Sequence, residues 1–506
     1  MKNRIVISSA TLLFAACTNL FGPSEAELSA FGEYVYRIDT LQLREGFQRM
    51  MADETPQSSP LLQCYTDRLP TDGFSVWHSR MGIADDADSL LSLLQREVPA
   101  AGLDPAFFRL SDIAQDLNVV HLLAFDSLGI DINILLPRLD FNLSRAYVLY
   151  AVGQRFGFVR PDLLFNQLER KDDSKNYTRL FDYAVTIPNY SEALQHLLAD
   201  DRMDYLCQSS PRDSVYLKLR EQLEATTDVA QRSKLSVNME RCRWQLKKPR
   251  DDERYVLVNL PAQQLWAVCP DSVVNMRICF GKTGTKTPLL QSDINRIDVN
   301  PDWIITPNII KNEVSVHAGD SAYFARNRYY IVEMSSGDTL NPTQVTVSQL
   351  KSGKLRVGQR GGAGNSLGRL VFRFPNNFSV YLHDTSNRSA FNRAERTLSH
   401  GCIRVQKPFD LALFALPELD EWDVDRLRLS IDLEPETDRG RDYLDEHTDD
   451  PRPLRLIRQL PVKPALPLHI VYYTVYPNPE TGSIETWSDP YGYDSVIAKA
   501  HPCLLP

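Results

Sequence analysis

Hydrophobic positions recur with a helical period through the first half of the chain. Leucines are closely spaced over residues 88–94, and Val215, Leu219 and Leu223 fall on one face of a helix, because side chains four positions apart lie together on a helix surface. Few stretches of this half alternate between apolar and polar residues. The pattern therefore predicts a helical domain over residues 25–250, with the apolar stripes forming its core.

The period changes in the second half, after a charged segment that contains one proline. Residues 255–260, 264–268 and 275–280 are short β-type runs, and strands at this spacing are typical of a sandwich or a barrel. We expect a mostly β, sandwich-like domain over residues 251–435, followed by a strand-bearing extension over 436–506. The predicted fold class is therefore α+β, with several domains.

Residues 300–368 interrupt the β pattern, and their last part, "VGQRGGAGNSLGR", is rich in glycine. These glycines form neither GxGxxG nor GxxxxGK[ST], and no strand-then-helix context surrounds them, so a phosphate-binding loop is not indicated. We interpret the segment as a flap or a series of tight turns, for which glycine is the usual residue. Alternation resumes at residues 369–374 and 379–383.

Composition supports a folded protein outside the nucleic-acid-binding classes. The chain has 506 residues, 43% of them hydrophobic and 24% charged, which is typical of a globular protein with two to four domains. Its formal net charge is −9. A general nucleic-acid binder needs a basic face, so we expect no nucleic-acid partner.

The N-terminus resembles a secretory signal. Lys2 and Arg4 form a basic start, and an apolar run that ends at Ala16 precedes Cys17. This run is too short to cross a bilayer, which takes about 20 residues. We interpret residues 1–17 as a lipoprotein signal that leaves Cys17 lipidated; the alternative is an ordinary signal cut near Ala16. Either reading predicts a periplasmic or cell-envelope protein, and the first predicts a lipid anchor.

The remaining cysteines leave their pairing open. Apart from Cys17 and Cys402 the chain has six, and an exported protein can form disulfides among them. Six cysteines allow fifteen pairings. Cys269 and Cys279 could face each other across a hairpin, and buried free thiols are the alternative for all six. No CxxC pair exists, so we do not predict a structural zinc site.

The stretch "YLHDTSNRSAFNRAERTLSHGCIRV" gathers two histidines and a cysteine. A metal site is a poor interpretation, because His400 and Cys402 flank Gly401 and lie too close together for an easy tetrahedral pair. We therefore predict neither a metal nor a cofactor. Taken singly, His383 or Cys402 would suit an ordinary structural role.

The combination points to nucleophilic catalysis. Side chains alternate along a strand, so His383 lies with Tyr381 and Ser379 on the less apolar face of the run that ends there. A thiol has a pKa of about 8.5 when free, and an imidazole within hydrogen-bond reach would convert Cys402 to a thiolate. Gly401 suits a tight turn whose backbone amides face an oxyanion.

A further cation lies next to this turn. Arg404 is two residues beyond Cys402, where it adds positive charge and could hold a substrate carboxylate through two hydrogen bonds.

"SHGCIR" preceded by a strand-borne histidine resembles the catalytic signature of the L,D-transpeptidases, the YkuD-type cysteine enzymes of bacterial cell walls. The resemblance covers most of residues 80–495 and is close in the C-terminal half. It points to the large branch of the family, which has a scaffold domain and an insertion that caps the substrate groove. The segments that carry it include "RYVLVNLPAQQLWAV", "NPDWIITPNIIKNEV", "GNSLGRLVFRFPNNFSVYLHDT" and "NMERCRW".

The resemblance implies a reaction and a role for each residue. A cysteine attacks a peptidoglycan stem at the carbonyl between its diamino acid and D-Ala, D-Ala leaves, and a side-chain amine of a second stem resolves the acyl-enzyme into a 3→3 cross-link. Donor and acceptor stem peptides are thus the expected partners, and residues 300–358 correspond to the capping insertion. The implied roles are Cys402 as nucleophile, His383 as base, Gly401 and Cys402 amides as oxyanion donors, His400, Ser399 and Arg404 as pocket residues, and Tyr381 and Trp303 as groove-lining aromatics.

Two alternatives stay open at this stage. The same acyl-enzyme resolved by water would make the protein an L,D-carboxypeptidase or hydrolase, and an inactive wall-binding scaffold would need none of this chemistry. Two departures from the family pattern stand out: we find no room for a small peptidoglycan-binding module, and Ser386 stands where proline is usual after His-Asp-Thr.

Overall fold

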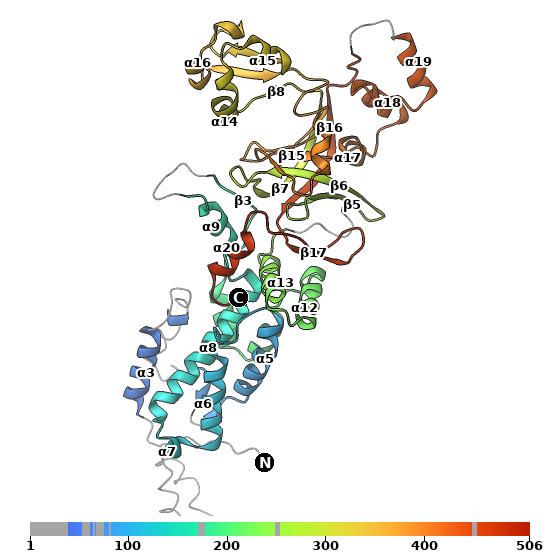
Figure 1. Ribbon diagram of the computed structural model, residues 1–506. Helices are drawn as coiled ribbons and strands as arrows, with labels where there is room; N and C mark the ends of the chain where they lie inside the picture. The colour runs from blue at the N-terminus through green and yellow to red at the C-terminus, as the bar shows by residue number, and fades with distance from the viewer. Residues whose placement is uncertain are drawn as a thin grey trace, which may run out of the picture. The chain divides into compact units, whose positions relative to one another are not determined.

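A computed structural model describes residues 39–52, 61–63, 66, 75–79, 82–170, 178–247, 253–447 and 453–505. They form two compact units (Figure 1). The helical unit contains the described residues up to Leu164, then Ala184–Leu246 and the residues from Gly492 onward; the β unit contains Phe165–Tyr183 and Lys247–Tyr491. The expected signal segment, with Cys17, lies outside the described residues, as does Cys64.

The helical unit is organised around one long helix, α8 (Ile132–Phe156), which is buried on nearly all sides. A helix without a solvent-facing stripe belongs in the centre of a fold. Asp131 caps its N-terminus by accepting from the Asn133 amide. A methyl group on Gly46 would lie 2.9 Å from Pro137, so α3 (Thr40–Ala52) packs closely against α8.

The other elements of this unit surround α8 or follow it in the chain (Figure 1). They are β1 (His78–Ser79), β2 (Gly82–Ile83), α5 (Asp86–Ala100), α6 (Leu110–Leu122), α7 (Phe125–Leu128), α10 (Tyr190–Leu197), α11 (Arg202–Cys207), α12 (Ser214–Ala225), α13 (Val229–Arg243) and α20 (Tyr493–Ala500), while α9 (Pro161–Gln167) leads from this unit into the β unit.

A buried carboxylate ties α13 to the end of α8. Glu240 is fully buried and accepts hydrogen bonds from the backbone amides of Phe158 (2.7 Å) and Val159 (2.8 Å). Its other oxygen lies 3.3 Å from the equally buried guanidinium of Arg243. Burial raises the pKa of Glu240 although Arg243 and the amides oppose the rise. The carboxylate thus satisfies backbone donors that would otherwise be buried without partners.

The β unit is built on a sheet that closes on itself. Strands pair in the order β12-β13-β15-β6-β5-β4-β16-β7, and β7 also pairs with β12; β3 continues from β7 and β14 pairs with β6. The strands are β3 (Phe181–Asp182), β4 (Tyr255–Asn259), β5 (Gln264–Cys269), β6 (Ser272–Gly281), β7 (Leu289–Val299), β12 (Leu370–Arg373), β13 (Leu382–His383), β14 (Thr397–Ser399), β15 (Ile403–Val405) and β16 (Gln459–Val471).

The predicted α+β class is confirmed, with a helical first half and a β-rich second half. Of the two β architectures that the sequence left open, the pairing of β7 with β12 gives a closed, barrel-like sheet in place of the sandwich-like one we expected. The segment expected as a C-terminal extension contributes β16, which lies between β4 and β7. Closure removes the edges that an open sheet would expose.

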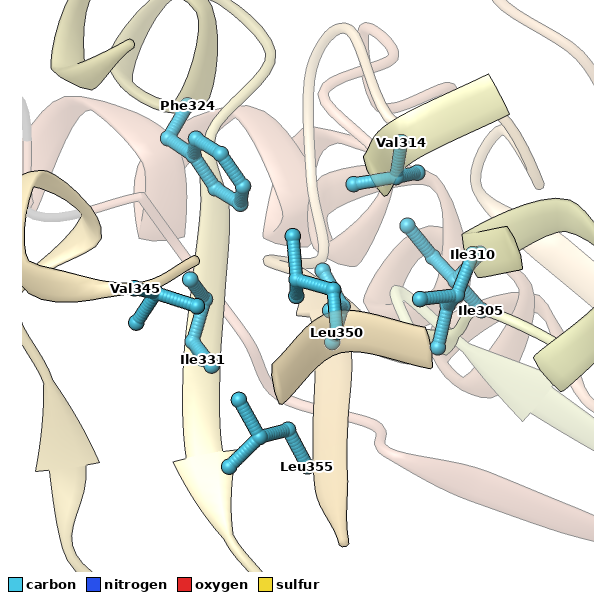
Figure 2. Close-up of a cluster of buried hydrophobic side chains, with 9 residues drawn as sticks. Ile305, Ile310, Val314, Phe324, Ile331, Val345, Leu350 and Leu355 are labelled. Carbon is cyan, nitrogen blue, oxygen red and sulfur yellow. The ribbon is translucent and has the colours of Figure 1, made fainter. Parts of the chain in front are cut away.

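The insertion, defined here as Trp303–Gln359, has a sheet and a core of its own. Its strands pair in the order β10 (Thr339–Leu340), β9 (Tyr329–Glu333), β11 (Leu355–Gln359) and β8 (Trp303–Ile304). Figure 2 shows side chains from its helices and strands meeting in one buried cluster, which consists of Ile305, Ile310, Val314, Phe324, Ile331, Val345, Leu350, Leu355 and Val357. Because these contacts are internal, the insertion has a hydrophobic core separate from that of the closed sheet.

Short helices complete the β unit. In the insertion they are α14 (Pro307–Ile309), the π-helical turn η3 (Ile310–Val314), the 3-10 turns η4 (Ser315–His317) and η5 (Pro342–Gln344), α15 (Ser321–Arg326) and α16 (Val347–Lys351). After it come η6 (Arg388–Asn392), α17 (Pro408–Ala415), α18 (Glu421–Ser430), α19 (Asp438–Glu446) and the hairpin of β17 (Val475–Pro477) and β18 (Ile484–Thr486). No helix in the described part of the chain has the length and apolar character needed to cross a membrane.

The structure shows whether the cysteines of the described residues form disulfides, which the sequence left open. The six in the described ranges are all free thiols: Cys207, Cys242, Cys269, Cys279, Cys402 and Cys503. Of the two alternatives for Cys269 and Cys279, a pair across the β5–β6 hairpin is excluded, because Cys269 lies opposite Ser272 at one end of the ladder while Gln264 pairs with Arg277 at the other. Cys279 therefore lies at the far end of the ladder.

Candidate active site

Two neighbouring strands place the predicted nucleophile and base side by side. β13 and β15 run parallel, with Leu382 opposite Ile403 and His383 opposite Arg404, and the Ile403 amide donates to the Tyr381 carbonyl at 3.1 Å. Register partners project from the same face of a sheet. Cys402 precedes Ile403 and therefore lies opposite Tyr381, the residue before Leu382. Tyr381 and His383 are two positions apart, so all three side chains lie on one face.

The strand that carries His383 is shorter than we expected. β13 covers only two residues, and Ser379 has a φ of 55°, so the run 379–383 is not one continuous strand. Although we expected His383 on the less apolar face of this run, that face is not open to solvent, because the exposed fraction of His383 is 5%. The histidine belongs to the interior of the site, packed edge-to-face against Tyr381 with ring centroids 5.6 Å apart.

The turn before Cys402 is held by hydrogen bonds within itself. Gly401 has a φ of 115°, a conformation that residues with a side chain rarely adopt. The Ser399 hydroxyl donates to the Cys402 carbonyl at 2.5 Å and accepts from the Gly401 amide at 3.1 Å. Among the described residues the Cys402 amide has no acceptor, so it is the available oxyanion donor while the Gly401 amide is occupied.

Thr287, which the sequence did not mark as a site residue, holds this turn by hydrogen bonds. Thr287 is fully buried, and its hydroxyl donates to the Gly401 carbonyl at 2.8 Å and accepts from the Gly281 amide at 2.9 Å. The Tyr491 hydroxyl lies 3.1 Å from the Thr287 amide and donates to the Gly281 carbonyl at 2.6 Å. Thr287 stands in a loop without periodic pattern, so no sequence signal marked it.

His383 is held as a neutral imidazole. Burial, together with the positive charges of Arg404 and Arg373, lowers its pKa to about 3. The Asp384 carbonyl, 2.5 Å from Nδ1, and the Leu367 carbonyl oppose this shift. At neutral pH the ring carries one proton, and the Asp384 carbonyl fixes that proton on Nδ1 by accepting it. The arrangement leaves Nε2 as the basic atom.

Cys402 is likewise held in its neutral form. Burial raises the pKa of the thiol, although hydrogen bonds from Tyr381 and the charges of Arg373 and Arg404 oppose the rise. The sulfur contacts the Ser379 carbonyl at 4.0 Å, and in the described structure no hydrogen bond joins it to His383. The hydrogen-bonded imidazole that we expected beside the sulfur is therefore missing from the described structure. The raised pKa of Cys402 favours its neutral thiol.

Tyr381 links the nucleophile to the insertion. Its hydroxyl interacts with the Cys402 thiol and with the side chain of Trp303, the first residue of β8. Burial raises the pKa of this hydroxyl, so it stays protonated and can donate. The Arg373 guanidinium lies 4.5 Å from the centre of its ring. Of the two predicted aromatics, Tyr381 thus contacts Cys402 and Trp303 contacts Tyr381.

A polar groove borders the turn on the other side. It measures about 360 Å³ and is lined by the insertion, the loop after β6 and His400. The His400 Nε2 atom lies 2.7 Å from Oε1 of Glu313, in the π-helical turn of the insertion. Both side chains are partly exposed, 33% and 53%, so the pair contributes little stability but spans the groove.

Arg404 has a different environment from the one we expected. Its Nε is buried without a hydrogen-bond partner among the described residues, and its charge acts on His383, Cys402 and the buried thiol of Cys279. It therefore shapes the field of the site from within the sheet. In the described ranges no three potential ligands from histidine, cysteine, aspartate or glutamate cluster as a metal site would require.

Comparison with known proteins shows which families the two halves of the chain match. Residues 253–421 match the YkuD family, the L,D-transpeptidase catalytic domain, and residues 64–223 match a scaffold domain. A Haemophilus influenzae protein named "Putative L,D-transpeptidase" is 28% identical over 267 residues, which are 52% of this chain and 48% of the relative. The match thus spans about half the length of that curated relative. The chain therefore contains a scaffold domain followed by an L,D-transpeptidase catalytic domain of the YkuD family, and Cys402 and His383 lie in the catalytic domain.

Proposed function

We propose that this protein is a cysteine-dependent peptidoglycan L,D-transpeptidase that forms 3→3 cross-links. The observation that supports the proposal is that Cys402, the residue before β15, has its side chain on the same face as His383 on the adjoining parallel strand β13. Membership of a family that acts on peptidoglycan stems supports the choice of substrate.

The first step is acylation. Because thiol and imidazole are both neutral in the resting enzyme, the Cys402 proton passes to Nε2 of His383 as sulfur attacks the carbonyl between the stem's diamino acid and D-Ala. The new S–C bond forms first, and the C–N bond then breaks. His383 returns the proton to the leaving nitrogen, so D-Ala departs as an amine and a thioester remains on Cys402.

The second step returns the thiol. A neutral side-chain amine of an acceptor stem attacks the thioester, a C–N bond forms, and the S–C bond breaks. His383 takes the proton from the amine and passes it to the departing sulfur. If water attacks in place of the amine, the same sequence yields a shortened stem, which is the L,D-carboxypeptidase alternative.

The surroundings of Cys402 suit a developing oxyanion. The Cys402 amide is free to donate, and rotation of the Ser399 side chain about its Cα–Cβ bond would move Oγ away and release the Gly401 amide as a second donor. The charges of Arg373 and Arg404 act on the sulfur from nearby. We assign His400, Tyr381 and Trp303 to the walls of the substrate groove, which the insertion borders.

We also propose a location in the cell envelope. The family consists of envelope enzymes, and the basic and apolar residues before Cys17 would export the chain and leave that cysteine lipidated. A periplasmic enzyme with a lipid anchor would meet peptidoglycan directly.

The test is the product of the purified protein on disaccharide-tetrapeptides. Transpeptidase activity gives cross-linked dimers with release of D-Ala, whereas tripeptides alone would indicate the carboxypeptidase. Cys402→Ala should abolish both products, and the matched variant Cys269→Ala should retain them. Intact-mass measurement should show one carbapenem-type lactam bound to wild type and none to Cys402→Ala. Turnover by Cys402→Ala would exclude the assignment.

The role of His383 needs its own variant. His383→Ala should lower kcat strongly, because it removes the neutral base that shares a face of the sheet with Cys402. Its unfolding transition should stay cooperative, because the ring is neutral and its removal leaves no buried charge. Loss of cooperative unfolding with activity retained in the folded fraction would instead assign His383 a structural role.

A further inference from the structure

Three arginines from separate segments converge on the glycine-rich loop between β11 and β12. Measured from the position that a Cβ would take on Gly362, Nη2 of Arg455 lies at 3.5 Å, Nη1 of Arg369 at 3.7 Å and Nη2 of Arg328 at 3.8 Å. Gly362 has a φ of 99° and leaves this space open. Three guanidinium groups therefore surround one small volume next to the backbone.

Their charge is only partly neutralised. Among the described residues one carboxylate, Asp432, accepts hydrogen bonds from these groups: from Arg369 and, at 3.0 Å, from Arg455. Arg328 donates to the carbonyls of Gly361, at 2.7 Å, and Ala363. Asp432 is thus the one carboxylate among the described residues that pairs directly with any of the three guanidinium groups, in a chain whose net charge is −9. Like charges held this close repel unless an anion lies between them.

Hydrogen-bond donors remain available at the same place. Nη2 of Arg455 has no acceptor among the described residues, and neither do the backbone amides of Gly362, Ala363 and Gly364. The nearby carboxylate of Asp302 is already engaged by the Gly361 amide at 2.8 Å. Adjacent free amides in a glycine turn form an anion-binding concavity.

We propose that Arg328, Arg369 and Arg455, with the amides of residues 362–364, form a binding site for a single oxyanion group, a carboxylate or a phosphate. Planar guanidinium forks match the paired oxygens of both groups. The site is open to solvent, since the side chains of Arg369 and Arg455 are 18% and 27% exposed. It differs from a nucleotide-binding loop, which the glycine spacing does not fit.

The loop also connects this site to the catalytic base. Its later residues include Leu367, whose carbonyl acts on the His383 ring, and Arg369, whose amide donates to the Asp384 carboxylate at 2.8 Å. The Asp384 carbonyl in turn accepts from His383. An anion that orders the loop would therefore order the residues that hold His383, and the carboxylates of a peptidoglycan stem are one source of such a group.

The site is tested first with inorganic phosphate, which needs no enzymatic activity. Calorimetric titration of the full chain at constant ionic strength should show binding to wild type. Arg455→Gln should weaken it about tenfold, because a charge-assisted hydrogen bond is lost, whereas Arg458→Gln, three residues further on, should leave it unchanged. Asp432→Asn should tighten binding, because it frees Arg369 and Arg455. The proposal would be overturned if wild type did not bind phosphate, or if Arg455→Gln and Arg458→Gln weakened phosphate binding equally.

Asp432→Asn keeps the test decisive if Arg455→Gln folds poorly, because it should tighten phosphate binding where Arg455→Gln weakens it. If the cluster has only a structural role, neither change should tighten phosphate binding, and both should destabilise the fold. Steady-state kinetics on disaccharide-tetrapeptides then identify the source of the oxyanion. A stem carboxylate predicts that Arg455→Gln raises KM about tenfold with kcat within about twofold and that phosphate competes with substrate. A free oxyanion predicts an unchanged KM and no competition. These kinetics depend on the proposed function; the phosphate titration does not.

Discussion

The neutral state of Cys402 and His383 can be read from the pH dependence of alkylation. Iodoacetamide reacts with the thiolate, so its rate follows the thiolate fraction. A cysteine with a pKa at or above about 8.5 is at most about 3% thiolate at pH 7, and its rate rises about a hundredfold between pH 6 and pH 8. Because burial raises the pKa of Cys402, we expect this steep rise with no plateau below pH 8.

His383 should have little influence on that profile. No hydrogen bond joins it to the sulfur in the described structure, and its pKa of about 3 keeps it from supplying an imidazolium at neutral pH. His383→Ala should therefore shift the alkylation midpoint by less than about half a pH unit, while it lowers turnover strongly. Catalysis needs the base during attack, and alkylation of a preformed thiolate does not.

The assay is mass spectrometry of individual peptides after timed alkylation from pH 5 to pH 9. Cys269 is an internal control, because a hydrogen bond with Ser272 at 3.1 Å lowers its pKa. Its alkylation rate should therefore begin to increase at a lower pH than the rate of Cys402. A rate at Cys402 that stays flat from pH 5 to pH 8 and becomes steep in His383→Ala would refute the reasoning. That result would mean an imidazolium–thiolate pair, which holds a thiolate at acid pH.

Three further substitutions test the supports of the two units by urea unfolding. Thr287→Val keeps the shape but leaves the Gly281 amide and the Gly401 carbonyl without their partner, which should cost about 1–3 kcal/mol and slow acylation; an unchanged midpoint would contradict it. Gly401→Ala should cost about 1–3 kcal/mol through backbone strain, because the nearest atoms to a new Cβ are 3.7 Å away and leave room for it. Glu240→Ala should cost about 3–5 kcal/mol, since it leaves the buried Arg243 guanidinium without its counter-ion, whereas Glu224→Ala at an exposed helical pair should cost less than about 0.5 kcal/mol.

The sequence predicted local elements well where burial imposes a period. The run 255–260 became β4, 264–268 became β5, and the stripe through Leu219 and Leu223 became the buried side of α12. Alternation fails at 379–383, where Ser379 adopts a positive φ. A turn that interrupts a strand leaves the identities of the flanking apolar residues unchanged, so the pattern could not show it.

The candidate site shows the same division between local and distant information. The sequence indicated Cys402, its glycine turn and the distant His383 as candidates, because nucleophilic catalysis requires these residue types. The structure places them near one another, and their catalytic roles stay predictions. The sequence did not identify Thr287, whose role depends on a loop meeting the turn 114 positions later. Nor did it give the protonation state of the pair, since a pKa depends on burial and on charges such as Arg373 and Arg404.

By itself, then, the sequence predicted a helical half and a β half, which the structure confirms, and a family resemblance that the comparisons bear out. The export signal and the assignment of a cysteine nucleophile with its base stay predictions. Only the tertiary structure decided that β7 pairs with β12 to close the sheet, that Trp303 reaches Tyr381, and that three arginines meet at Gly362. The physical reason is the distance along the chain over which each kind of interaction acts. Hydrophobic periodicity reports which face of an element is buried, whereas closure, groove walls and charge clusters depend on contacts between segments far apart in the chain.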